Sequence, residues 1–273
     1  MSRENGLFVG MCTMDIVYYS DAFPKENKKI KVNEYERYIG GPAANAAITY
    51  AALGGRATLA TCLGNSLESR MILEELNSYG VTVLNYSSQE ILPNLSSIII
   101  SEDGKRTIIS GQHPFVCDKQ YALDEYDFAL FDCNQQEISV DILKKFLDKP
   151  VVLDAGSWKP NMDLFLQRAD IVIASEDFAN PEGKNVFEIE NCKATHKAIT
   201  RGERSVLFEK EEIKVPQVTA VDTLGAGDIF HGAFCFAYFN EKKMMRDALE
   251  FAAKIASESV RYKGPREWRK LWN

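Results

Sequence analysis

Short apolar runs alternate with stretches of helical periodicity along almost the whole chain. The runs that predict strands are Leu7–Cys12, Ala57–Cys62, Phe128–Cys133, Val151–Asp154 and Ile171–Ala174, and Ile199–Phe208 has the pattern of a strand pair. Helical patterns lie at Ala43–Leu53, Glu68–Tyr79, Val140–Leu147, Met162–Gln167 and Met244–Arg261. Alternating strands and helices are typical of repeated βαβ units. We therefore predict an α/β fold whose mostly parallel sheet is covered by helices on both faces.

Two stretches interrupt this alternation with strand patterns that have no helix of their own. Residues 16–39 have alternating character, and residues 95–110 form a hairpin pattern whose turn is Asp103–Gly104. Inserted strands of this kind predict a small β-sheet lid at the carboxyl edge of the main sheet, where open α/β sheets bind ligands. A decorative edge hairpin is the alternative. We favour a lid or a dimer contact, because exposed strands of this composition need covering.

Composition places the chain among soluble globular enzymes. Its 273 residues suit one main domain over residues 1–273, and 45% hydrophobic with 26% charged residues excludes disordered and fibrous classes. The net charge of -7, without a compensating Lys/Arg stripe, argues against nucleic-acid binding. The polar start of the chain predicts no secretion signal and a cytoplasmic location. The longest apolar stretch, Ala226–Phe239, contains Asp228 and His231 and is too short to span a membrane.

Cysteine and histidine usage gives no indication of a metal centre. The six cysteines include no Cys-x-x-Cys pair and several lie in apolar runs, so we expect reduced, buried thiols. The three histidines are far apart and lack metal-type spacing with the cysteines, which argues against a zinc site. For His231 we expect a helix-face or core role rather than a chemical one.

A glycine-rich turn at residues 222–228 is the strongest functional signal. It reads Asp-Thr-Leu-Gly-Ala-Gly-Asp and leads directly into an apolar helix pattern that begins with Ile229. Unpaired backbone N–H groups and the partial positive charge at the start of a helix attract an anion such as phosphate. Asp228 would repel a resting phosphate, but a carboxylate there can take a proton from an attacking hydroxyl. The turn predicts phosphoryl transfer with Asp228 as base, although Gly-Ala-Gly-Asp alone is also compatible with an ordinary helix N-cap.

Two further segments supply polar groups for a hydroxylated acceptor. Gly40–Gly41–Pro42 leads into a helix, and small residues there let a ligand approach the backbone. Asn45 is a polar residue on an otherwise apolar helix, so its amide needs a partner, which is either a sugar hydroxyl or an interior carbonyl. Asp15 follows the apolar segment Leu7–Met14, and the end of a strand would place its carboxylate at the crevice. A simple turn aspartate is the alternative.

These motifs, in this order, resemble the ribokinase-like carbohydrate kinases of the PfkB family over nearly the whole chain. The resemblance rests on Asp15, Gly40–Gly41 with Asn45, Thr200–Arg201–Gly202, and Asp222–Thr223 with Gly225–Ala226–Gly227–Asp228. Within the family, the start of the chain is most similar to ketohexokinase and fructokinase-type members. The resemblance implies a ribokinase-like three-layer α/β/α core with a mostly parallel sheet and a small β-sheet lid. It also implies transfer of the γ-phosphoryl group of ATP to a sugar hydroxyl.

The same resemblance implies a role for each matching residue. The expected general base is Asp228, and the expected anion hole is formed by the N–H groups of Gly225, Ala226 and Gly227. The expected substrate residues are Asp15, Gly41, Asn45 and, on a lid strand, Arg106. The expected nucleotide residues are Thr200, Gly202, Thr223, Gly225 and Gly227. The expected cofactors are ATP and Mg²⁺, with a monovalent cation such as K⁺ as a further candidate, and the expected assembly is a monomer or a homodimer through the lid.

Two positions depart from the family pattern. Many members have an Asn-x-x-Glu motif that organises magnesium where this chain has Ser175–Phe178, so Glu176 and Asp177 are the candidate metal ligands. Pro42 stands where ketohexokinases typically have a sugar-binding Asn, which weakens the case for a ketohexose. Two alternatives to a sugar kinase therefore stay open. They are a nucleoside kinase of the same family and a catalytically silent sugar-binding protein descended from a kinase.

Overall fold

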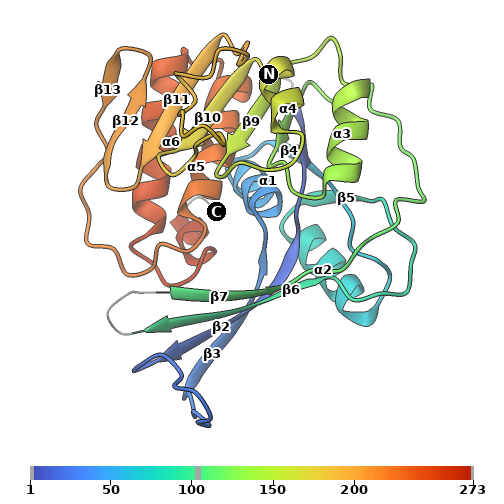
Figure 1. Cartoon of the computed structure of the whole chain (residues 1–273), viewed down its shortest axis with the longest axis vertical. Helices are drawn as coiled ribbons and strands as arrows, with labels where there is room; N and C mark the ends of the chain where they lie inside the picture. Colours follow the sequence, from blue (N-terminus) through green and yellow to red (C-terminus); the bar gives the residue numbers. More distant parts are fainter. Residues whose placement is uncertain (1–2, 102–105, 272–273) are drawn as a thin grey trace.

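The computed structural model of the chain describes residues 3–101 and 106–271 and is built around one large sheet (Figure 1). Its nine strands run in the order β13-β12-β11-β10-β9-β8-β1-β4-β5. They are β1 (Asn5–Val9), β4 (Arg56–Thr61), β5 (Val81–Asn85), β8 (Phe128–Phe131), β9 (Val151–Ala155), β10 (Ile171–Ser175), β11 (His196–Arg201), β12 (Arg204–Phe208) and β13 (Glu211–Ile213). Neighbouring strands are parallel from β5 to β11, and β12 and β13 pair antiparallel. The predicted α/β class with a mostly parallel sheet is confirmed.

Helices cover both faces of this sheet because its central strands are apolar on both sides. One face carries α1 (Pro42–Ala52), α2 (Leu67–Ser78), α5 (Ala226–Cys235) and α6 (Met245–Ser259). The other face carries α3 (Gln136–Lys145) and α4 (Met162–Arg168). Within β1, Phe8 packs into the first core and Leu7 and Val9 into the second, as side chains that alternate along a strand must. The predicted three-layer architecture follows from this arrangement.

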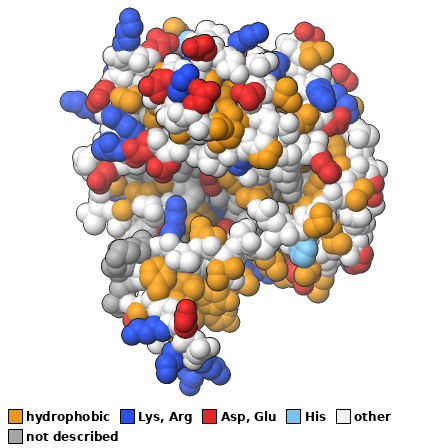
Figure 2. All heavy atoms as spheres, viewed as in Figure 1, with side chains coloured by type: hydrophobic (Ala, Val, Ile, Leu, Met, Phe, Trp, Pro, Cys, Tyr) orange, Lys and Arg blue, Asp and Glu red, His pale blue; other side chains and the backbone are white. Residues whose placement is uncertain are grey.

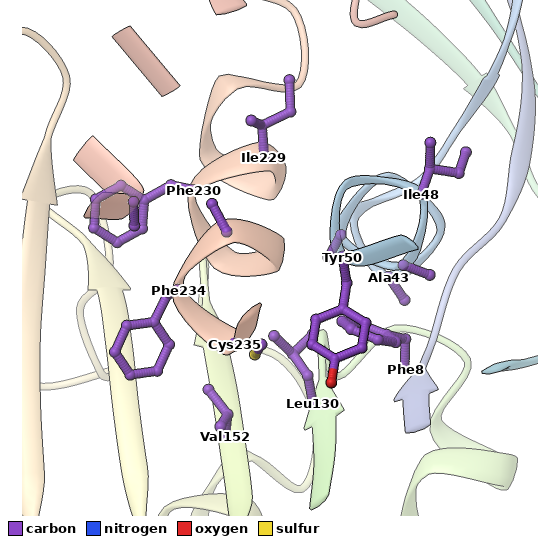
Figure 3. Packing of buried hydrophobic residues seen from close by; sticks show 14 of the residues in the cluster. Phe8, Ala43, Ile48, Tyr50, Leu130, Val152, Ile229, Phe230, Phe234 and Cys235 are labelled. Carbon is purple, nitrogen blue, oxygen red and sulfur yellow. The ribbon is translucent and has the colours of Figure 1, made fainter. Parts of the chain in front are cut away.

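The helices α1 and α5 pack closely against each other within the larger core (Figure 3). Gly232 on α5 permits this contact, because a Cβ atom there would lie 2.3 Å from the carbonyl oxygen of Ala46 and 2.7 Å from Cβ of Thr49. Larger side chains of both helices, such as Tyr50 and Phe234, belong to the core between the helices and the sheet. The close packing brings the first turns of α1 and α5 together.

Four further strands form a separate, smaller sheet that projects from the main body (Figure 1). They are β2 (Thr13–Ser20), β3 (Glu34–Gly40), β6 (Asn94–Ser101) and β7 (Arg106–Gly111), in the order β3-β2-β6-β7. The turn predicted at Asp103–Gly104 lies outside the described residues. Figure 2 shows a hollow between this smaller sheet and the main body.

The predicted helices and strands are present with shifted ends. The helix predicted at Ala43–Leu53 spans Pro42–Ala52, and the closing helix predicted at Met244–Arg261 spans Met245–Ser259. The edge strands β5 and β13 were not predicted, because β5 is only partly buried and β13 has just three residues. The six cysteines are free, as expected, and all except Cys117 are buried. In the described chain, no helix is both long and apolar enough to cross a membrane.

Candidate active site

The glycine-rich turn ends at the N-terminus of α5. Gly225 is the N-cap of this helix and has φ +74°, a left-handed conformation that suits glycine. The helix begins at Ala226, so the N–H groups of its first turn lack intrahelical acceptors, although that of Ala226 donates to the carbonyl oxygen of Thr223 at 3.3 Å. Asp222 anchors the turn, because its Oδ1 accepts from the N–H of Leu224 at 2.9 Å and its Oδ2 from the N–H of Gly264 at 3.0 Å. The fold thus holds a helix N-terminus in a shape that suits an anion.

Asp228 stands in the first turn of α5 and accepts a hydrogen bond from the side chain of Asn45. The donor Nδ2 and the acceptor Oδ2 are 2.6 Å apart. Loss of hydration, and then the charge of Asp154, raise the pKa of Asp228 to about 7, against the lowering effects of the Asn45 hydrogen bond and of His231. A half-buried carboxyl group with a pKa near neutrality can both take up and release a proton at physiological pH.

Gly41 brings the start of α1 against the loop that follows β1. It has φ +94°, and a Cβ atom would lie 2.3 Å from the carbonyl oxygen of Met11, so a side chain does not fit. Pro42 begins the helix at a position where its missing N–H costs nothing. The carbonyl oxygen of Gly41 accepts from the N–H of Asn45 at 2.9 Å. This first turn holds the buried Asn45 side chain on the side that faces Asp228.

Asp15 lies on β2, where the smaller sheet meets the main body. Its Oδ1 accepts from the hydroxyl of Thr13 at 2.7 Å, and Ser96 on the neighbouring strand also hydrogen-bonds to it. Gly40 leaves space for the carboxylate, because a Cβ atom there would lie 1.9 Å from Oδ2 of Asp15. Burial raises the pKa of Asp15, and the two hydrogen bonds and the charge of Arg266 oppose that change. Asp15 is therefore held beside the glycine pair that leads into α1.

The buried carboxylate of Asp132 was not singled out from the sequence, and it stabilises this arrangement through hydrogen bonds from backbone N–H groups. Asp132 directly follows β8, and its Oδ2 accepts from the N–H groups of Met11 at 2.9 Å and Ala43 at 3.1 Å. Burial raises the pKa of Asp132 to about 6. The carboxylate joins the loop after β1 to the start of α1. The signal that could have identified it is a carboxylate directly after an apolar strand, which is the signal used for Asp15.

Asp154 was also missed, and it lies buried near the end of β9. Its Oδ1 is 3.6 Å from Nε2 of His231. The same ring lies 2.7 Å from the carbonyl oxygen of Gly227 through Nδ1 and 3.2 Å from that of Ile173 through Nε2. His231 therefore connects α5 to the sheet, in line with its expected core role. The charge of Asp154 raises the pKa of Asp228.

A cavity of about 350 Å³ opens on the other side of the turn. Its lining is mainly apolar and comes from the β11–β12 hairpin, the loop after β13, α5 and α6. The predicted nucleotide residues that line it are Thr200, Gly202, Thr223 and Gly227. Gly225 instead faces Pro265 and Asn45, at 3.3 Å and 3.4 Å from a Cβ placed on it. An apolar slot that ends at a helix N-terminus suits a molecule with an aromatic base at one end and phosphates at the other.

Three predicted residues lie apart from this constellation. Arg106 is exposed at the start of the edge strand β7, and the described structure shows no contact between it and Asp15 or Asn45. Glu176 and Asp177 directly follow β10 and are exposed, and Glu176 forms an ion pair with Arg204. The described residues contain no cluster of three or more His, Cys, Asp or Glu side chains suited to a metal ion.

Known proteins are similar to this chain over nearly its whole length. A profile of the pfkB family of carbohydrate kinases matches residues 4–270. The ribokinase of Bacillus subtilis is 28% identical over 278 residues, which cover 94% of this chain and 93% of the relative. The ketohexokinase of Mus musculus is 23% identical over 295 residues, which cover 97% of this chain and 98% of the relative. The crystal structure of ribokinase from Thermotoga maritima has the same fold, with a TM-score of 0.78, 23% identity and 99% of each chain covered.

Proposed function

The chain belongs to the pfkB family of carbohydrate kinases, and from that premise we propose that it transfers the γ-phosphoryl group of ATP to a hydroxyl of a sugar or sugar derivative. The main support for the proposal is that the first turn of α5 faces both the apolar cavity and Asn45. The first turn of α5 borders the apolar cavity through Gly227 and presents Asp228 to Asn45 on its other side. A phosphoryl donor on one side and a hydroxyl acceptor on the other would therefore meet at the same helix N-terminus.

In the proposed reaction, Asp228 is the general base. Its carboxylate takes the proton of the acceptor hydroxyl while the hydroxyl oxygen forms a bond to the γ-phosphorus. The bond between this phosphorus and the β–γ bridging oxygen breaks, and ADP leaves with the electron pair. The transfer needs accurate placement and stabilisation of negative charge more than a protein nucleophile. The raised pKa of Asp228 matches it to proton transfer near neutral pH.

The nucleotide and the transferring phosphoryl group occupy the cavity and the turn in this proposal. The adenine lies between the β11–β12 hairpin and α6, next to Thr200, Gly202 and Thr223. The N–H groups of Gly225, Ala226 and Gly227 stabilise the charge that develops on the phosphoryl oxygens. Since Gly225 faces Asn45 rather than the cavity, it serves the transferring group more than the nucleotide.

The acceptor lies between the smaller sheet and α1. Asp15, Gly41 and Asn45 hold its hydroxyl groups in this proposal, because Asp15 lies against Gly40 and Asn45 follows in the first turn of α1. The smaller sheet acts as a lid that keeps water from competing for the phosphoryl group. In this proposal, Arg106 reaches the substrate only if the lid moves. A homodimer through the lid is also part of the proposal, because the edge strand β7 of the lid is exposed.

Magnesium would be held through water by Asp177, with Glu176 as a second carboxylate. Their position after β10 fits this role, since Asp177 is exposed and Mg²⁺ in phosphoryl-transfer sites commonly uses one or two carboxylates plus phosphates. Glu176 fits less well because Arg204 already pairs with it. When bound, the ion neutralises charge on the β- and γ-phosphates. A monovalent cation such as K⁺ is a further candidate cofactor, which assays with and without the ion would reveal.

The proposal is tested by measuring ADP release against ketoses, aldoses, amino-sugar adducts and nucleosides. We expect a sugar or sugar derivative to be the preferred acceptor and Asp228→Asn to lower kcat about 100- to 10,000-fold, with acceptor binding retained. Asp124→Asn is the matched control, because this exposed carboxylate precedes β8 at the opposite edge of the sheet. Preference for a nucleoside would make the protein a nucleoside kinase. Sugar binding without ADP release would identify a silent sugar-binding protein.

A further inference from the structure

A buried arginine from the end of the chain lies behind the acceptor site. Arg266 follows the turn at Gly264, and its side chain is almost fully buried. Its Nη2 donates to Oδ1 of Asn45 at 2.6 Å and to the carbonyl oxygen of Ile39 at 2.5 Å. Its Nη1 makes a longer bond of 3.3 Å to the carbonyl oxygen of Pro265, and its buried Nε has no partner in the described structure. The described carboxylates form no ion pair with it, although the charges of Glu75 on α2 and of Asp228 act on it from a longer distance.

The guanidinium group decides which way the Asn45 amide faces. An arginine side chain has donors and no acceptor, so the atom of Asn45 that meets it must be the oxygen. The amide nitrogen is then left for Asp228, to which it donates at 2.6 Å. With the amide reversed, an oxygen would face the carboxylate of Asp228 and an NH₂ group would face the guanidinium. Both contacts would be repulsive, so Arg266 reinforces the orientation in which Asn45 donates to an ionised Asp228.

The charge of Arg266 also acts on both carboxylates of the acceptor site. It lowers the pKa of Asp15, in opposition to burial, and it interacts with the charge of Asp228. Burial is the main influence on Arg266 itself and lowers its pKa, but an arginine remains protonated in proteins. A fixed positive charge that reaches both carboxylates without pairing with either supports their ionised forms while leaving their oxygens for substrate.

The same segment of chain holds the lid. The carbonyl oxygen that Arg266 binds belongs to Ile39, near the end of the lid strand β3. Lys263 forms an ion pair with Glu34 at the start of that strand and lies 3.7 Å from the ring centroid of Tyr19 on β2. Residues 263–266 therefore connect the lid strands to the Asn45–Asp228 pair.

We propose that Arg266 is a positioning residue for phosphoryl transfer, which fixes the Asn45 amide so that it holds the Asp228 carboxylate ready for the acceptor hydroxyl. The inference rests on the proposed function, since Asp228 must be the base for its orientation to affect the rate. Arg266 itself touches neither the acceptor nor the nucleotide in this proposal. Its effect on the reaction passes through Asn45.

Arg269 provides a matched control within the same segment. Both arginines have a buried Nε without a partner in the described structure. Both also lie near Tyr79, with 5.8 Å from Cζ of Arg266 and 4.3 Å from Cζ of Arg269 to the centroid of its ring. Arg269 differs because the described structure gives it no hydrogen bond to Asn45 or Asp228. If the two arginines serve only to pack the end of the chain, Arg266→Met and Arg269→Met should have the same consequences.

The test compares Arg266→Met, Arg266→Lys and Arg269→Met in kinetics over pH 5.5 to 9 with the preferred acceptor. We expect Arg266→Met to lower kcat about 10- to 100-fold with the KM for ATP unchanged, because the base loses its fixed orientation. The acidic limb of the pH–rate profile of Arg266→Met should also move to higher pH. The other groups that act on Asp228, which are Asp132 after β8, Asp154 on β9 and His231 on α5, are unchanged in this variant. Arg266→Lys should recover part of the rate, and Arg269→Met should retain wild-type kinetics.

A crystal structure of each variant separates this inference from the proposed function, because it does not depend on turnover. In Arg266→Met the Asn45 amide should turn away from Asp228, whereas in Arg269→Met the 2.6 Å contact should persist. Unchanged kcat and pH profile in Arg266→Met, or an unmoved Asn45, would overturn the inference even if the protein is a kinase. If Arg266→Met does not fold, Arg266→Lys takes its place, and wild-type kinetics in a variant whose Asn45 amide has turned away from Asp228 would overturn the inference. Absence of turnover by the wild-type protein would instead count against the proposed function.

Discussion

The ionised carboxylate of Asp228 should destabilise the folded protein at neutral and higher pH. Its pKa is raised from 3.8 to about 7 in the folded state. Below about pH 4 the group is protonated in both states and has no effect on stability. Above that pH the unfolded chain releases the proton first, so stability falls as pH rises to about 7 and then stays constant. This is the sign expected for a carboxyl group with a raised folded-state pKa.

Asp228→Asn removes this ionisation while keeping an oxygen that can accept from Asn45. Since one pKa unit corresponds to about 1.4 kcal/mol, the difference of about three units gives a gain of about 4 kcal/mol at pH 8. Solvent that reaches the half-buried side chain reduces this gain, so we expect about 2–4 kcal/mol at pH 8 and at most about 1.5 kcal/mol at pH 5. The variant should therefore be more stable and less active than the wild type.

The assay is equilibrium unfolding in guanidinium chloride, followed by tryptophan fluorescence at pH 5 and pH 8 and constant ionic strength. Asp124→Asn is the control, because the same chemical change at an exposed carboxylate should leave the free energy of unfolding within about 0.5 kcal/mol. An equal gain at both pH values would show that the Asp228→Asn effect does not come from ionisation. A loss of stability at pH 8 would refute the argument that the charge of Asp228 is costly to bury.

Three further predictions concern catalysis, packing and the nucleotide cavity. The kcat/KM of the wild type should fall about tenfold per pH unit below about pH 7, because Asp228 becomes protonated; a rate that is flat from pH 5 to 7 would contradict its role as base. Gly232→Ala should lower the free energy of unfolding in guanidinium chloride by about 1–3 kcal/mol, because the added methyl group would meet Ala46 on α1. Gly111→Ala, with its nearest contact at 3.6 Å, should have little effect in the same assay. Ala256→Phe should raise the KM for ATP about tenfold or more by filling the cavity beside α6, with kcat at saturating ATP nearly unchanged. An unaltered KM for ATP would show that the nucleotide binds elsewhere.

Features with a local physical origin could be read from the sequence. The alternation of strand and helix patterns predicted the parallel sheet and its two helical layers, because side-chain periodicity reports which faces of an element are buried. The turn that ends at Asp228 and the glycine at position 41 could be identified for a similar reason. A helix N-terminus and a left-handed backbone conformation depend on neighbouring residues in the chain. These signals were enough to predict the turn at the start of α5 and to propose Asp228 as a base.

The partners of these groups were decided by the tertiary structure. Asp132 and Asp154 have partners on loops and helices that meet only at the carboxyl edge of the sheet. Their place at or just after the ends of apolar strands was nevertheless a usable signal. Arg266 had no such signal, because its partner Asn45 is 221 residues away and no local pattern distinguishes it from other arginines. The raised pKa of Asp228 likewise depends on burial and on charges from other strands. The chemical groups near the turn at Asp228 can be listed from the sequence alone. Which of them are held, charged and oriented together depends on the folded packing, because desolvation and hydrogen-bond geometry arise only when distant segments meet.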